Sequence, residues 1–144
     1  MITTEDLENM FYLPGELKQI DRQIDRQTEK LERLSSIHPT PKKDCAAAVA
    51  ELISIYKERR RLCAAQLEKL RMFISGIEDP GTRELFILRY ERGKTWVQIH
   101  HICTGKGQYY ADGSSIRKIC ERYIKRYNRN EAKQSKKGAT EGLL

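Results

Sequence analysis

The sequence lacks any long apolar run. Nowhere in its 144 residues do roughly 18 apolar residues follow one another, as a membrane-spanning helix would require. The first ten residues, MITTEDLENM, are acidic and lack the basic and then apolar pattern of a secretory signal. We therefore expect a cytoplasmic protein with no membrane partner.

Paired cysteines and catalytic motifs are also missing. The four cysteines form no CxxC pair, and reduced thiols are the rule in a cytoplasm. A zinc site drawn from His100, His101, Cys103 and Cys120 lacks the spacing of paired ligands, so we expect no metal. The chain has no Gly-rich phosphate loop, no carboxylates clustered in an apolar setting and no GxSxG motif. These absences predict a protein that is not an enzyme and holds no cofactor.

Apolar residues are scarce, and charge is spread unevenly. The chain is 39% apolar and 33% charged, which suits long, half-exposed helices. Residues 1–80 hold 13 Lys and Arg against 14 Asp and Glu, whereas residues 81–144 hold 14 against 6. Net charge is therefore −1 in the first part and +8 in the second. This asymmetry favours a polyanionic partner, such as nucleic acid, for the C-terminal part.

Two segments place apolar residues at alternating steps of three and four, which is the pattern of a coiled-coil seam. The first covers residues 13–34, with polar Gln27 at one seam position. The second covers residues 49–77 and includes Arg60. Between them, SSIHPTPKK (35–43) contains two prolines, which end a helix. The two segments should fold back as an antiparallel, coiled-coil-like hairpin.

Pairing of these seams brings Arg60 close to three polar side chains. Arg60 is expected to reach Gln27, or Asp21 or Asp25 beside it. A two-helix hairpin this narrow buries little on its own, so packing of a second copy would complete a four-helix homodimer. The alternative is a monomeric hairpin that rests on its own C-terminal domain.

Short helices are expected after the hairpin. Asp79 is placed as the N-cap of a helix over residues 81–92, and Gly93 is a natural C-terminal stop. Thr95 then caps another helix, whose Trp96 turns inward. Three short helices with one Trp and a few Ile residues can form a small core.

The last helix begins near Ser114, capped by Asp112 or by Ser114 itself. Helical spacing puts the apolar residues between Ile116 and Tyr127 on one side. The opposite side and its edges carry hydroxyls and cations, which are the candidate DNA-binding residues: Ser114, Ser115, Arg117, Lys118, Arg122, Lys125, Arg126 and Arg129.

A major groove admits an α-helix whose first turns meet base edges. On that geometry Ser115, Lys118 and Arg122 would contact bases. The phosphates would be contacted by Lys125, Arg126 and Arg129, and Arg117 is open to either role. The alternative is a solvated basic face on a helical bundle.

The residues LRYERGKTWVQI (88–99) and SSIRKICERYIKRY (114–127) resemble a recurring pattern. They are similar to the helix-turn-helix of phage and prophage regulators related to sigma factor region four, including ArpU-type and RinA-type late-gene regulators. The resemblance implies that the last helix reads DNA, and it implies core positions at Leu88, Tyr90, Trp96 and Ile99. One segment departs from the family: residues 104–113 are about twice as long as the usual turn of three to four residues, or more.

Together these observations predict an all-α protein in three parts: a helical hairpin at residues 1–78, a helix-turn-helix domain at 79–130, and a disordered basic tail at 131–144. The expected function is sequence-specific binding of double-stranded DNA by a homodimeric phage or prophage transcriptional regulator, in the cytoplasm of a bacterial host. One alternative is the DNA-recognition subunit of a phage terminase, which would form a ring. Another is a sigma-like module that binds RNA polymerase through its helical arm.

Overall fold

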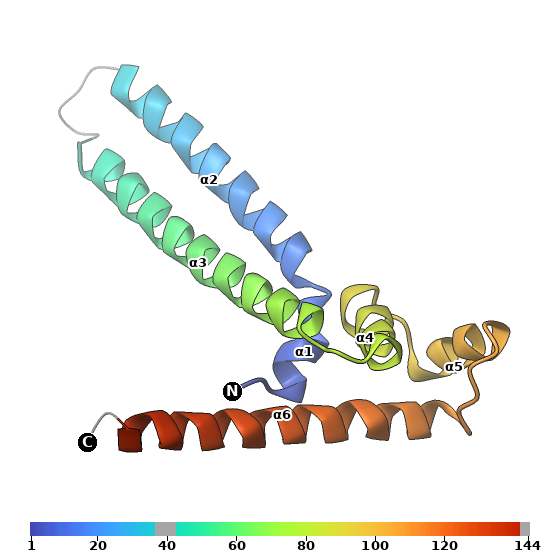
Figure 1. Ribbon diagram of the computed structural model, residues 1–144. Coiled ribbons are helices and arrows are strands. Elements are labelled where there is room, and N and C mark those ends of the chain that lie inside the picture. The colour runs from blue at the N-terminus through green and yellow to red at the C-terminus, as the bar shows by residue number, and fades with distance from the viewer. Residues whose placement is uncertain (37–42, 142–144) are drawn as a thin grey trace. The chain divides into compact units, whose positions relative to one another are not determined.

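The chain is all-α, as the sequence predicts. The computed structural model describes residues 1–36 and 43–141, and those residues form helices and connections without a strand (Figure 1). The helices are α1 (Thr4–Met10), α2 (Leu13–Ser36), α3 (Lys43–Ser75), α4 (Pro80–Phe86), the π-helical η1 (Ile87–Glu91), α5 (Trp96–Gly105) and α6 (Gly113–Glu141). The predicted break at 35–43 lies mostly outside the described residues. In the part that is described, no helix combines the length and the apolar character that crossing a membrane requires.

The helices group into two compact units. One unit, called the hairpin unit below, is Tyr12–Lys69; the other, called the α6 unit, combines Met1–Phe11 with Leu70–Leu144. This division differs from the expected boundary at residue 78, because the first eleven residues belong with the C-terminal part. The physical reason is that Ile2, Leu7 and Met10 are buried there, between 0 and 3% exposed.

In the hairpin unit, α2 and α3 run antiparallel (Figure 1). The Nε of Arg60 lies 2.6 Å from Oδ1 of Asp21, so of the three expected partners it is Asp21 that Arg60 reaches. Near the start of α2, the thiol of Cys63 lies 3.9 Å from the carbonyl oxygen of Leu13. The seam of α2 is half-buried along its whole length, and Ile20 is its one buried position. Two helices alone leave much of this seam in contact with water.

The α6 unit has a dense aromatic core. Phe86 is fully buried and lies edge-on to Phe73 and Tyr123, with ring centroids 5.7 and 5.5 Å apart. Tyr90 packs on Phe86 at 5.3 Å and on Trp96 at 6.3 Å. Edge-to-face pairs of this kind add to the free energy gained by apolar burial. The core thus joins the end of α3 to α4, η1, α5 and α6.

The N-terminal segment is fastened to this unit by polar contacts. The backbone N–H of Ile2 donates to Oδ1 of Asn128 at 2.9 Å, and the amide of Asn128 donates to the carbonyl oxygen of Ile2 at 2.6 Å. Glu8 pairs with Arg89 at 2.8 Å. At the end of α1, the ring of Phe11 approaches the α-carbon of Gly93 so closely that a Cβ there would lie 2.9 Å from Cδ2. The sequence did not reveal these long-range contacts.

The helix ends follow the predicted capping residues. Asp79 accepts from the N–H of Thr82 at 2.9 Å and caps α4. Gly93 adopts a φ of 67°, which suits glycine, just after η1. Thr95 and Gln98 form a reciprocal capping box at the start of α5.

The expected disordered tail at 131–144 is wrong for most of its length. Helix α6 continues without a break to Glu141, and residues 142–144 lie outside the described residues. The segment EAKQSKK (131–137) is rich in Glu, Ala, Lys and Gln, which favour helix even without a packing partner. Such a polar composition is also typical of disorder, but residues 131–138 are exposed on a helix.

Candidate nucleic-acid interface

Two close contacts fix where α6 begins. Asp112 is the N-cap: its Oδ1 accepts from the N–H of Ser115 at 2.8 Å. Hydrogen bonds from the backbone and side chain of Ser115 hold the pKa of the Asp112 carboxyl below its ordinary value of 3.8. The next residue, Gly113, is buried against the backbone of Trp96, where a Cβ would lie 2.8 Å from the carbonyl carbon. The first turn of α6 is therefore held against the first turn of α5.

The connection before α6 folds back along α5. Helix α5 continues to Gly105, so the connection is residues 106–112, shorter than the predicted 104–113. The N–H of Gln108 donates to the carbonyl oxygen of Cys103 at 2.9 Å, and Nε2 of His100 lies 3.0 Å from the carbonyl oxygen of Tyr110. A simple helix-turn-helix uses a turn of about three to four residues. Here the longer connection returns to the start of α5, so α6 begins beside Trp96.

Helix α6 has one buried face. Ile116, Cys120 and Ile124 are between 0 and 4% exposed. Burial raises the pKa of the Cys120 thiol to about 12, so this side chain is a neutral packing group at physiological pH. The helix is anchored along this face, and its rotation about its own axis is thereby set.

The predicted DNA-binding residues lie mainly on the opposite, exposed face. Those that are exposed are Ser114, Arg117, Lys118, Arg122, Lys125, Arg126 and Arg129. Ser115 is half-buried and takes part in the cap with Asp112, which sets it apart from the others. Arg117 pairs with Glu121 on its own helix at 2.9 Å, which reduces the charge that it offers to a ligand.

Four of these cations line one open depression of about 330 Å³: Arg122, Lys125, Arg126 and Arg129. Arg126 also lies 5.9 Å from the centroid of the Tyr123 ring, a cation–π distance. Among the residues that the structure describes, no acidic side chain lines the depression. Four cations around one shallow surface suit a ligand that presents several negative charges, as the phosphates of a nucleic acid do.

A row of exposed cations runs along α6 and continues beyond Arg129. From Lys118 it proceeds by steps of three or four through Arg122, Lys125 and Arg129 to Lys133, which is exposed on the same continuous helix. At about 1.5 Å per residue, Lys118 and Lys133 lie roughly 22 Å apart along α6. The regular spacing of these cations in the sequence is a signal of this extension, which the expectation of a disordered tail at 131–144 did not include.

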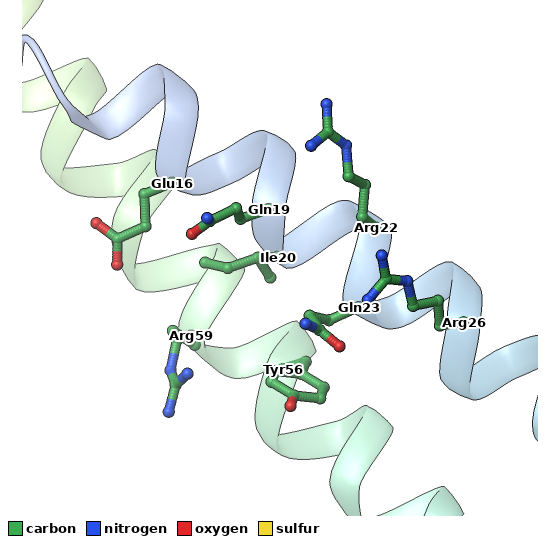
Figure 2. A pocket seen from close by; sticks show the side chains of 8 residues that line it. All are labelled: Glu16, Gln19, Ile20, Arg22, Gln23, Arg26, Tyr56 and Arg59. Carbon is green, nitrogen blue, oxygen red and sulfur yellow. The ribbon is translucent and has the colours of Figure 1, made fainter.

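The hairpin unit offers a different surface, a groove of about 390 Å³ between α2 and α3 (Figure 2). Ile20 lies between the two helices, whereas the guanidinium of Arg22 points away from α3 (Figure 2). Long polar side chains dominate the lining, with Ile20 and Tyr56 as its larger apolar members. Small-molecule sites are mostly apolar and enclosed, so this groove is a weaker candidate than the basic face of α6.

Comparison with protein-family models, with curated proteins and with solved structures found no match for this chain. Within residues 1–36 and 43–141, no three His, Cys, Asp or Glu side chains come together as a metal site. Of the zinc ligands considered from the sequence, His100 contacts the Tyr110 carbonyl, and Cys103 and Cys120 are buried.

Proposed function

We propose that this protein is a sequence-specific, double-stranded DNA-binding regulator of phage or prophage transcription, and that it acts without catalysis. The observation that carries the proposal is the division of α6 into two faces. One face is locked into the core by Ile116, Cys120 and Ile124, and the other presents the cations around the 330 Å³ depression. The resemblance of residues 88–99 and 114–127 to sigma-region-four-like regulators supports the same function.

In this function α6 enters the major groove by its first turns. Lys118 and Arg122 lie within the first three turns of α6 and would contact base edges, as residues near the start of a recognition helix do. The four cations of the depression include Lys125, Arg126 and Arg129, which would contact phosphates. Helix α6 has 29 residues and is about 43 Å long at ~1.5 Å per residue. Because a major groove is about 12 Å wide, its later turns must leave the groove and cross the backbone.

The division between base and phosphate contacts can be tested by two variants. The Lys118→Ala/Arg122→Ala variant should lose its preference for a selected duplex over a random one, at about 1–3 kcal/mol for each base contact. The Lys125→Ala variant should weaken binding to all duplexes alike and reduce the slope of log K against log salt by about 0.9. The measurement is fluorescence anisotropy with both duplexes over a salt series.

Lys57→Ala is the matched control, because Lys57 is an exposed cation on α3 in the hairpin unit. It should leave both affinity and salt slope unchanged. If both α6 variants bind DNA with the parent's affinity, the basic face of α6 is not the DNA-binding surface.

We further propose that the regulator is a homodimer joined through the hairpin unit and located in the cytoplasm of a bacterial host. The half-buried seam of α2, with only Ile20 buried, supports a second packing partner for this unit. A terminase subunit would instead assemble as a ring of many copies, and a sigma-like module would be captured by RNA polymerase. The mass of the particle in solution and a polymerase pull-down separate these alternatives.

A further inference from the structure

The connection between α5 and α6 presents an exposed tyrosine. Tyr109 is 90% exposed, the largest value among the large apolar side chains of the described residues. Within the same part of the chain, its side chain has no hydrogen bond, ion pair or ring contact. The adjacent Tyr110 is half-buried, and burial raises the pKa of its phenol. The two neighbouring tyrosines therefore differ: Tyr110 packs on the protein, whereas Tyr109 faces solvent.

The backbone on both sides of Tyr109 is held by hydrogen bonds to α5. The N–H of Gln108 donates to the carbonyl oxygen of Cys103 at 2.9 Å. On the other side, Nε2 of His100 lies 3.0 Å from the carbonyl oxygen of Tyr110. A ring that projects from a fixed backbone loses little conformational freedom when it meets a ligand, so less affinity is spent on ordering it. This exposed tyrosine is therefore well prepared to contact another molecule.

Tyr109 lies beside the end of α6 that enters DNA in the proposed function. It precedes the N-cap Asp112 by three residues, so their α-carbons are at most about 11 Å apart. Hydrogen bonds from Ser115 and, to a smaller extent, the charges of His100 and Lys118 lower the pKa of the Asp112 carboxyl, so Lys118 is near the cap. A major groove is only about 12 Å wide. The start of a helix inside it is therefore close to the bordering sugar–phosphate strand.

We propose that Tyr109 contacts this bordering strand, with its hydroxyl donating to a phosphate oxygen and its ring packing on the deoxyribose. Tyrosine is among the side chains that bond DNA phosphates, and its apolar ring carries a polar tip. The contact rests on the proposed DNA-binding function and extends it. The predicted DNA-binding residues all lie on α6 itself, whereas this neutral contact comes from the connection before the helix.

Two variants separate the hydroxyl from the ring. Tyr109→Phe should weaken binding to a selected and to a random duplex alike, by about tenfold, because a hydrogen bond to a charged acceptor is lost. Tyr109→Ala should weaken both by roughly a further threefold, since the apolar contact with the sugar is lost as well. The slope of log K against log salt should stay at the parent's value, because a neutral side chain releases no counterions. Fluorescence anisotropy over a salt series measures all three quantities.

Tyr12→Phe is the matched control, because Tyr12 is a 67% exposed tyrosine of the hairpin unit. It should bind both duplexes as the parent does, and the circular dichroism of all variants should match that of the parent. A smaller salt slope in the Tyr109 variants, or a loss confined to the selected duplex, would overturn the phosphate contact. If these variants bind as the parent does while Lys118→Ala/Arg122→Ala loses its preference, the Tyr109 contact is wrong and the proposed function stands. If the parent binds neither duplex, both are wrong.

Chemical modification of the parent protein tests the contact without a substitution. Tetranitromethane nitrates exposed tyrosines, and peptide mass spectrometry gives the extent of nitration at each position. Saturating duplex DNA should lower the nitration of Tyr109 severalfold and leave that of Tyr12 unchanged. Equal nitration of Tyr109 with and without bound DNA would contradict the proposal.

Discussion

The two units of this protein differ in how they gain stability. Of the buried apolar side chains in the described residues, sixteen lie in the α6 unit, against five in the hairpin unit: Ile20, Val49, Ile53, Cys63 and Leu67. In the hairpin unit, most seam positions of α2 are only half-buried, and Ile55 and Leu62 of α3 are exposed to solvent. The difference indicates separate tasks. The α6 unit holds one helix rigidly enough to present a charged face, whereas the hairpin unit leaves much of its apolar surface in contact with water.

The largest expected effect comes from the aromatic core of the α6 unit. Phe86→Ala removes a fully buried ring that packs against Phe73, Tyr90 and Tyr123. It should lower the free energy of unfolding by about 3–5 kcal/mol. Leu31→Ala, at a half-buried seam position of α2, should cost about 1 kcal/mol or less because the side chain is already partly hydrated. Chemical denaturation of both variants measures the contrast, and equal losses would show that the two units are packed alike.

Ion pairs give the next contrast. Arg89, whose side chain is 22% exposed, bonds Glu8 at 2.8 Å and the Lys94 carbonyl at 3.1 Å, and lies 4.7 Å from the Trp96 ring centroid. Arg89→Ala should therefore destabilise the protein by about 2–3 kcal/mol. Arg60, 48% exposed beside Asp21, is solvated, so Arg60→Ala should cost below about 1 kcal/mol.

These two arginine variants are compared by urea unfolding at low and at high salt. The cost of Arg60→Ala should shrink as salt screens the exposed pair, while the cost of Arg89→Ala should change little. If Arg60→Ala proves the more costly of the two, the hairpin unit holds more of the stability than its burial indicates.

Two glycines should respond with opposite signs. Gly113→Ala places a methyl group 2.8 Å from the backbone of Trp96, so α6 must shift, at about 1–3 kcal/mol. Gly15→Ala in α2 meets nothing within 4 Å and should stabilise the helix by up to ~1 kcal/mol. Thermal unfolding reports both changes, and DNA affinity should fall for Gly113→Ala alone. A neutral Gly113→Ala would mean that α6 does not depend on its close approach to α5.

The smallest expected effect is the pH dependence of the Asp112 cap. Because hydrogen bonds from Ser115 lower the pKa of Asp112, the cap stabilises the folded chain above the ordinary value of 3.8 and is lost as pH falls through the folded pKa. Asp112→Asn keeps a capping oxygen that does not titrate there. The loss of stability on acidification should therefore be smaller in Asp112→Asn than in the parent, and identical acid titrations would exclude the carboxylate as the cap.

Much of the hairpin could be predicted from sequence periodicity, because each of its two helices has its own local pattern of apolar residues. The alternating steps of three and four identified the less exposed positions of α2, Gln27 included, and placed Arg60 within reach of Asp21. Capping residues such as Asp79, Thr95 and Asp112 could also be predicted, because a capping side chain bonds a backbone N–H only three residues away.

The features that could not be predicted depend on contacts between distant residues. Ile2 and Asn128 are 126 residues apart, and the seven-residue α1 is too short to show which partner its apolar side covers. The course of residues 106–112 depends on Gly113 packing against Trp96, a tertiary contact without a local signature. The sequence does not predict the helical continuation of α6, because exposed polar composition does not by itself separate a solvated helix from a disordered tail.

Photo-crosslinking tests most directly our proposal that DNA contacts α6 and not the hairpin unit. A photoreactive side chain would replace Arg122 on α6 or, in a second variant, Lys57 on α3, and each protein would be irradiated with duplex DNA. We expect a DNA adduct from position 122 that competitor DNA abolishes, and little from position 57. An adduct from position 57 with none from position 122 would contradict it.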